Sequence, residues 1–133
     1  MWLILLFALL NAAFGFFGRH VIKFSGFELT PVAIAICAWH GENVLLAGLF
    51  LPVAYACTSV YDLKYLWITI PAAIIVGFLA LAVHNAYLLL VVYHLLGLSV
   101  AYVFTYLDVK YFLFVLVNVA MNIGLARVYG FMT

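Results

Sequence analysis

The sequence predicts an all-α, polytopic transmembrane helix bundle of about six spans, the second of them a short, half-length helix. Three observations support this prediction. Of the 133 residues, 71% are hydrophobic and 7% are charged, whereas soluble domains average about 25% charged residues. The few charged residues divide the chain into apolar runs, and one of these runs contains a helix start and a helix stop close together. We therefore expect a single integral membrane domain over residues 1–133, with no room for a second, soluble domain.

Charged residues mark the ends of the predicted spans, because a charged side chain at the centre of a bilayer costs about 2.5–3.5 kcal/mol. A span needs about 20 apolar residues, so the run 65–107 is long enough for two, with a turn at His84 and Asn85. No Lys or Arg precedes the first apolar run, so it is predicted as a permanent span and not as a signal peptide. The predicted spans are approximately 2–18, 24–41, 43–60, 65–83, 86–107 and 111–127.

The second span contains the signals of a half-length helix. Thr30 followed by Pro31 is typical of an N-cap and a first helical residue, and Gly41 is typical of a helix stop. A helix over 31–40 would be about 15 Å long, which is half of the hydrocarbon thickness of about 30 Å. We expect the segment 24–30 to be irregular and covered by protein, because irregular backbone is not tolerated in contact with lipid.

Two sets of side chains should make contacts between helices. Ala8, Ala12 and Gly15 share one face of the first span, in a small-xxx-small pattern that lets two backbones approach closely. This helix-docking face either packs within the bundle or binds another subunit. Asn118 and Asn122 share a face of the last span, and amides in hydrocarbon need hydrogen-bond partners. We expect both to point into the bundle, where they either bond to neighbouring helices or line a solute path.

Gly48 and Pro52 are further candidates for such a path. A proline inside a helix frees the carbonyl group four residues earlier, here that of Gly48. Transporters use broken helices to present backbone carbonyls to ions, although most prolines in membrane helices are kinks that neighbouring groups satisfy. Both interpretations stay open for these two residues.

A weak metal-site candidate comprises Cys37, His40, Glu42 and the more distant His84. Thiolate, imidazole and carboxylate groups together bind zinc or copper. A single Cys-x-x-His falls short of the four ligands of a structural site, and the alternative is interfacial histidines with a solvated glutamate. The sequence therefore leaves the cofactor unknown.

Signatures of catalysis and of nucleic-acid binding are missing from the sequence. It contains no G-x-S-x-G, H-E-x-x-H, P-loop or G-x-G-x-x-G motif, so an enzyme is not predicted. The net charge is only +1, whereas a nucleic-acid-binding protein carries a clear excess of Lys and Arg. Asp62 and Asp108 each lie two residues from a lysine in a short loop, whereas a proton relay would need an acid within a span.

The six predicted spans and the Ala-x-x-x-Ala spacing of Ala8 and Ala12 resemble the substrate-binding S components of energy-coupling-factor vitamin transporters. The resemblance implies a transport module whose first helix docks a partner. This chain is shorter than that family, and its charge bias places the termini outside, where the family has them inside. Membership of the family is therefore not inferred.

Three functions remain open. The favoured one is a non-catalytic subunit of a membrane complex or a homo-oligomer, because loops this short leave the helices as the main contact surface. The alternatives are a carrier or channel for a small solute or ion, and a metal-binding membrane enzyme or electron-transfer subunit. The expected partners are the lipid bilayer and other membrane subunits or further copies of the chain, with no nucleic acid.

The distribution of positive charge predicts the orientation of six spans. Four of the five Lys and Arg residues then share one side of the membrane, which the positive-inside rule identifies as cytoplasmic. The loops expected on that side are 19–28, 62–64 and 108–110, and both termini lie outside. Single cysteines substituted at Lys64 and at Lys110 should be protected from a membrane-impermeant reagent added to intact cells. Labelling of either position from outside would show that the topology is wrong.

Overall fold

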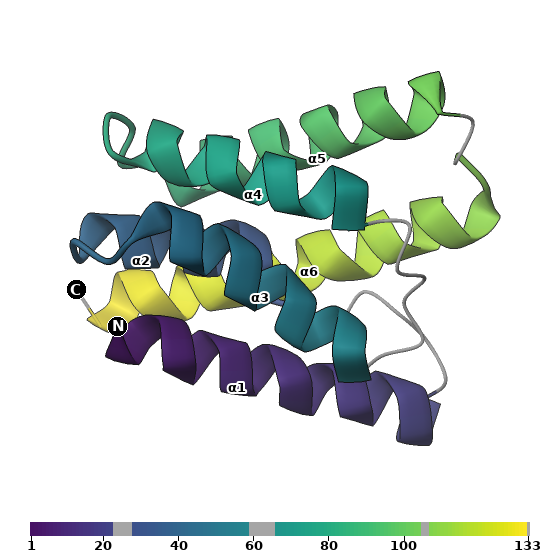
Figure 1. The fold of residues 1–133 in the computed structure, drawn as a ribbon, viewed down its shortest axis with the longest axis horizontal. Coiled ribbons are helices and arrows are strands. Elements are labelled where there is room, and N and C mark those ends of the chain that lie inside the picture. Colours follow the sequence, from purple (N-terminus) through teal and green to yellow (C-terminus); the bar gives the residue numbers. More distant parts are fainter. Residues whose placement is uncertain (23–27, 59–65, 105–106, 133) are drawn as a thin grey trace.

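The computed structural model describes residues 1–22, 28–58, 66–104 and 107–132, and all regular structure in this part of the chain is helical (Figure 1). The predicted all-α bundle is confirmed, and one helix overlaps each predicted span. The last helix continues past Arg127, which the sequence analysis used as a boundary. The helices are α1 (Trp2–Phe17), α2 (Thr30–Trp39), α3 (Val44–Thr58), α4 (Leu66–Ala80), α5 (Ala86–Val103) and α6 (Val109–Met132), and Gly18–Ile22 extends α1 as a π-helical turn.

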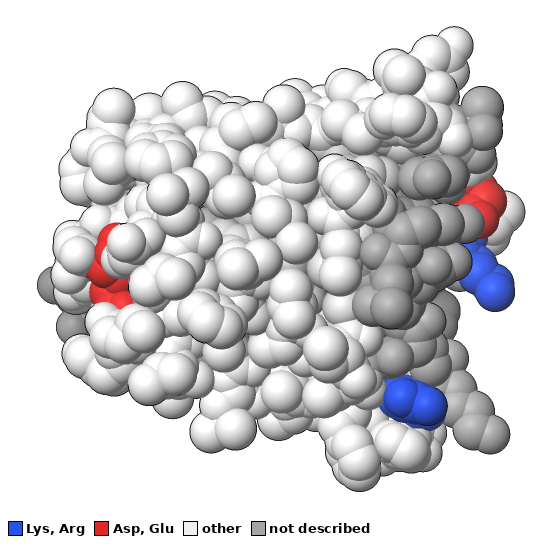
Figure 2. All heavy atoms as spheres, in the orientation of Figure 1, with Lys and Arg blue, Asp and Glu red and all other residues white. Residues whose placement is uncertain are grey.

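Three helical stretches are long and apolar enough to cross a bilayer, as judged by length and composition. They are Trp2–Val21, Ala86–Val103 and Val109–Phe131. Within the described residues, α2, α3 and α4 are shorter apolar helices, so three full-length spans are found where the sequence predicted about six. Figure 2 shows acidic and basic atoms at the two ends of the visible face and a broad belt without described charged atoms between them. This distribution is compatible with a membrane location, since charged groups favour the membrane surfaces.

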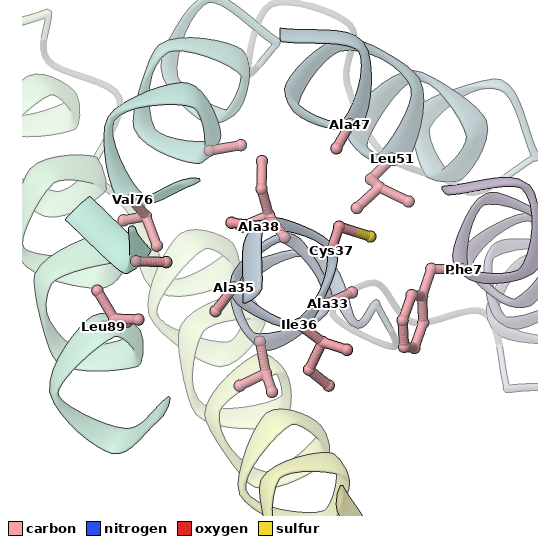
Figure 3. Packing of buried hydrophobic residues seen from close by; sticks show 14 of the residues in the cluster. Phe7, Ala33, Ala35, Ile36, Cys37, Ala38, Ala47, Leu51, Val76 and Leu89 are labelled. Atoms are coloured by element: carbon pink, nitrogen blue, oxygen red, sulfur yellow. The ribbon is translucent and has the colours of Figure 1, made fainter. Parts of the chain in front are cut away.

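The short helix α2 forms the centre of the bundle. It contacts all five other helices, while α3 packs on α1 and α4, and α5 packs on α4 and α6. Every residue from Thr30 to Ala38 is buried, as expected of a helix that is apolar all round. Figure 3 shows this helix almost end-on, with Phe7 of α1, Leu51 of α3, Val76 of α4 and Leu89 of α5 directed towards it.

Helix α2 begins near mid-depth and ends at the face of the bundle that carries both chain termini (Figure 1). Pro31 lies in its first turn. After His40 the chain turns at Gly41, whose φ of 76° lies in the left-handed region that favours glycine. Trp39 fixes this end, because its Nε1 donates hydrogen bonds to the carbonyls of Ala80 (2.8 Å) and Val83 (3.3 Å). The predicted short second helix is therefore confirmed.

Small residues allow the helices around α2 to approach closely. A Cβ atom added at Gly48 would lie 2.5 Å from the Ile74 Cγ1 atom and 3.3 Å from the Ile74 backbone nitrogen. Gly48 therefore serves the contact between α3 and α4. On α1, Gly15 is buried and Ala8 packs against the main core, so the predicted docking face is directed at least partly into the protein's own bundle.

Two glycine substitutions test this packing. Replacing Gly48 with Ala should destabilise the protein by about 1–3 kcal/mol, the usual cost of forcing an extra methyl group into a well-packed contact. The matched control is Gly124→Ala in α6, where an added Cβ meets no atom within 4 Å. This change should be neutral or stabilising by up to about 1 kcal/mol, because Ala has the higher helix propensity. Thermal unfolding in mild detergent measures both, and equal effects would contradict the close contact of α3 with α4.

Candidate functional site

Buried polar side chains gather where α2 begins, and we call this group the central polar cluster. Each is at most 1% exposed. Asn11 lies near the middle of α1 with its π-helical extension, and the two α6 asparagines straddle the middle of that helix, so the cluster lies at mid-depth. Its members are Asn11, Glu28, Thr30, Asn118 and Asn122.

Two asparagines from surrounding helices cap the start of α2. The backbone N–H of Leu29 donates to Asn11 Oδ1 at 2.8 Å, and that of Val32 donates to Asn122 Oδ1 at 3.1 Å. Pro31 has no N–H to satisfy. The first turn of a helix has N–H groups without partners inside the helix, and these two amide oxygens supply partners where water cannot. The bonds also fix the orientation of both amides, since only the oxygen can accept.

Glu28 lies at the centre of this arrangement. Thr30 Oγ1 donates to its Oε2 at 3.0 Å, and Asn118 Nδ2 donates to its Oε1 at 3.2 Å. Asn122 Nδ2 donates to the Glu28 backbone carbonyl at 2.9 Å. Both carboxyl oxygens therefore have hydrogen-bond donors, and all of these donors are neutral. An acidic group is also favoured at a helix N-terminus, where the peptide dipoles leave partial positive charge.

The cluster extends to α3 through Asn11. The Nδ2 of Asn11 donates to Thr30 Oγ1 and to the Leu51 carbonyl, each at 3.0 Å. The carbonyl that joins the cluster is thus the one directly before Pro52, and not that of Gly48, which the sequence analysis proposed. Pro52 is buried within a continuous α3. Asn118 and Asn122, for which interhelical bonding and a path with Gly48 and Pro52 were both open, bond to Glu28 and to the first turn of α2.

His94 extends the central polar cluster to α5. Its side chain is 7% exposed and is hydrogen-bonded to that of Asn118. The other ring nitrogen, Nε2, is buried and has no hydrogen-bond partner within the described part of the chain. A chain of polar groups therefore runs from Thr30 through Glu28 and Asn118 to His94.

The residues of the metal-site candidate have separate partners. Cys37 is buried in the core of α2, while His40 Nε2 lies 3.0 Å from the Tyr129 hydroxyl and His84 stacks on Trp39. No group of three or more His, Cys, Asp or Glu side chains suited to a metal ion occurs among the described residues. The convergent ligand set is therefore not found there.

Glu42 binds the start of α1. Its Oε2 pairs with the Met1 amino group, and its Oε1 accepts from the backbone N–H of Leu3 at 3.0 Å. Burial raises the pKa of Glu42, but the bonds from the Met1 amino group, Leu3 and Ile4 outweigh this effect and hold the pKa below its usual value. This carboxylate is thus a helix cap at the end of the bundle.

The position of Glu28 differs from the one expected from the sequence. The sequence analysis placed this residue in a charged cytoplasmic loop over 19–28. The residue is instead buried at mid-depth, and residues 23–27 lie outside the described part of the chain. Its position two residues before Thr30 was a usable signal, because a half-length helix that starts at mid-depth brings the preceding residue into the interior. Asn11 and His94 were also missed, since each is a single polar residue in an apolar run.

No protein-family model, curated protein or solved structure matches this chain. The candidate site therefore depends on the geometry of the central polar cluster.

Replacing Asn122 with Leu tests the capping of α2. The change leaves the buried Val32 N–H and the Glu28 carbonyl without this partner, and an unsatisfied buried group costs about 1–3 kcal/mol. The loss should exceed the average of about 0.6 kcal/mol for hydrogen bonds between membrane helices. The control is Leu116→Ala on the exposed face of α6, which should change stability little. If thermal unfolding in detergent shows the same small effect for both variants, the capping role is wrong.

Proposed function

We propose that the protein is a small integral membrane transport module in which Glu28 takes up and releases a proton at mid-depth. The observation that supports this proposal is a fully buried carboxyl group in the centre of an apolar bundle, held by neutral donors at the start of a half-length helix. Ionisable residues inside membrane segments are rare and typically mark ion pathways or proton relays.

The architecture around Glu28 has the features of a transport site. Secondary transporters place coupling-ion sites near the bilayer midplane, where a discontinuous helix ends and exposes backbone groups. Here α2 begins at that depth, and the amide groups of Asn11 and Asn122 bind its first turn. Glu28 lies directly before α2 and not within a spanning helix, but its burial at mid-depth supplies an acid at the depth that the sequence analysis required for a proton relay.

A proton suits the site better than a metal ion. The oxygens of Glu28 are already occupied by hydroxyl and amide donors, and a metal ion would have to replace these groups. A proton needs no coordination shell. His94 is the second group in the cluster that can exchange a proton, and it contacts Glu28 through Asn118.

A subunit role in a membrane complex or a homo-oligomer is the second candidate. It is favoured by α6, which buries a single stripe of residues, while the apolar side chains of Phe112, Leu116 and Val128 on this helix are exposed. The buried stripe consists of Tyr111, Phe114, Asn118, Asn122 and Ala126. In this case the bilayer and other membrane subunits or further copies cover the exposed faces, in the six-span topology with outside termini predicted from the charge bias.

The proton site is tested with Glu28→Gln, which keeps the side-chain size and removes the ionisable group. In lipid nanodiscs, stepping the pH should produce an infrared carboxyl band that the variant lacks. In vesicles with an imposed pH gradient, wild-type proton flux should exceed that of protein-free vesicles, and the variant should lose it. Glu42→Gln is the matched control, because Glu42 lies at the end of the bundle, and it should retain both the band and the flux.

Three outcomes would overturn the proposal. A carboxyl band that persists in Glu28→Gln would show that another group takes up the proton. Equal flux in the two glutamate variants would exclude Glu28 from the path. Wild-type flux no greater than in protein-free vesicles, together with a stoichiometric partner chain on purification in mild detergent, would favour the subunit role.

A further inference from the structure

Two side chains donate hydrogen bonds to the carboxyl group of Glu28, and they differ in what they offer once that group takes up a proton. Asn118 Nδ2 donates to Oε1 at 3.2 Å, and Thr30 Oγ1 donates to Oε2 at 3.0 Å. A carboxylate only accepts hydrogen bonds, whereas a protonated carboxyl group has an O–H that needs an acceptor. An amide nitrogen cannot accept, but a hydroxyl group has one donor and two acceptor positions. The two carboxyl oxygens are therefore not equivalent as places for a proton.

Asn118 is held with its amide nitrogen towards Glu28. Its Oδ1 accepts from Asn122 Nδ2 at 3.2 Å, and its Nδ2 also donates to the Glu28 backbone carbonyl at 3.4 Å. Asn122 is fixed in turn, because its Oδ1 accepts from the backbone N–H of Val32 at 3.1 Å. Rotation of the Asn118 amide by half a turn would bring its Nδ2 against Asn122 Nδ2, two donors facing each other. Asn118 therefore offers Oε1 a donor and not an acceptor.

Thr30 can reverse its hydrogen bond to Glu28. Its Oγ1 accepts from Asn11 Nδ2 at 3.0 Å, and the Asn11 amide is fixed because its Oδ1 accepts from the Leu29 N–H at 2.8 Å. Besides the bond from Asn11, the hydroxyl oxygen has a second acceptor position. Rotation of the hydroxyl hydrogen about the Cβ–Oγ1 bond directs this position at Oε2 without moving a heavy atom.

We infer that Thr30 determines where Glu28 carries its proton. A proton from solvent binds to Oε2, the new O–H donates to Thr30 Oγ1, and the hydroxyl hydrogen of Thr30 turns away. Release of the proton reverses these steps, and the O–H bond on Oε2 is the one covalent bond made and broken. Oε1 stays the carbonyl oxygen and keeps its hydrogen bond from Asn118. Thr30 is thus a positioning residue, and this role rests on the proposed function, in which Glu28 exchanges a proton.

The groups around the carboxyl come from four helices. They are Asn11 of α1, Thr30 of α2, Asn118 and Asn122 of α6, and His94 of α5. Among these groups His94 is the one that titrates, and it is bonded to Asn118, on the side of Oε1. A response that depends on the Thr30 hydroxyl therefore reports on Oε2 and not on His94.

Two substitutions at Thr30 test this assignment. Thr30→Val keeps the shape of the side chain and removes the acceptor for the protonated carboxyl group. The infrared carboxyl band that appears on acidification in nanodiscs should then move to higher wavenumber. Proton flux in vesicles should fall about tenfold, the usual effect of one buried hydrogen bond. Thr30→Ser keeps a hydroxyl group and should retain the wild-type band position and flux.

Thr58→Val is the matched control for the loss of a threonine hydroxyl. Thr58 lies at the end of α3, where its Oγ1 donates to the carbonyls of Ala54 and Tyr55 in the same helix. This change should leave the carboxyl band and the flux as they are in the wild type.

A measurement on the unaltered protein does not depend on how well the variants fold. Threonine with a heavy carbon isotope at Cβ shifts the C–O stretching band of its hydroxyl group. The difference spectrum between acidic and neutral pH should contain this band, because the Thr30 hydroxyl changes from donor to acceptor. The band should be missing in Glu28→Gln, and in Thr30→Ser grown with the same labelled threonine.

The possible failures are distinguishable. A carboxyl band that Glu28→Gln removes but Thr30→Val leaves in place, with unchanged flux, would overturn the role of Thr30 and leave the proton site standing. A labelled threonine band that persists in Thr30→Ser would show that a different threonine responds, and would also overturn this role. If the wild-type protein has no carboxyl band that Glu28→Gln removes, the proposed function is wrong, and the inference about Thr30 fails with it.

Discussion

The structure depends on one constraint, which is that a helix starting in the middle of a membrane bundle has no water to bind its first N–H groups. Lipid offers no substitute, and each unsatisfied group is costly there. Here Pro31 removes one N–H, while Asn11 and Asn122 bind those of Leu29 and Val32. Because these asparagines come from α1 and α6, the start of α2 joins both helices to the centre. The apolar packing around α2 then follows, since every side of this helix has a neighbour.

The same constraint brings a carboxyl group into the interior. Once the chain enters the bundle before α2, Glu28 lies among the amides that cap the helix. The two α6 asparagines donate hydrogen bonds to its side chain and to its backbone carbonyl. The same asparagine side chains therefore help to hold the start of α2 and set the surroundings of the carboxyl group. A substitution at Asn118 or Asn122 therefore alters helix capping and the surroundings of Glu28 together. The two effects can be separated by Glu28→Gln, which removes the ionisable group and keeps the size of the side chain.

Much of the fold could be predicted from local sequence. Thr30-Pro31 and Gly41 marked the half-length helix, and the spacing of Asn118 and Asn122 placed both on one face, which the structure buries. Glu28 could not be assigned in this way, because it was treated as one of the charged residues that mark the boundary between the first two spans. Asn11 and His94 gain their roles from residues distant in sequence, and no local pattern encodes such contacts. For the same reason the spacing of Cys37 and His40 suggested a common site, whereas their environments in the structure differ.

The hydrogen bonds from α6 to the start of α2 join residues 90 or more positions apart. This separation has a consequence for biosynthesis, because the chain emerges from the ribosome in order and α6 is made after α2. Until α6 has entered the membrane, the Val32 N–H and the Glu28 carboxyl lack their asparagine partners. The central helix can therefore reach its final environment only after α6 has been translated, and until then the other helices form an incomplete shell around it.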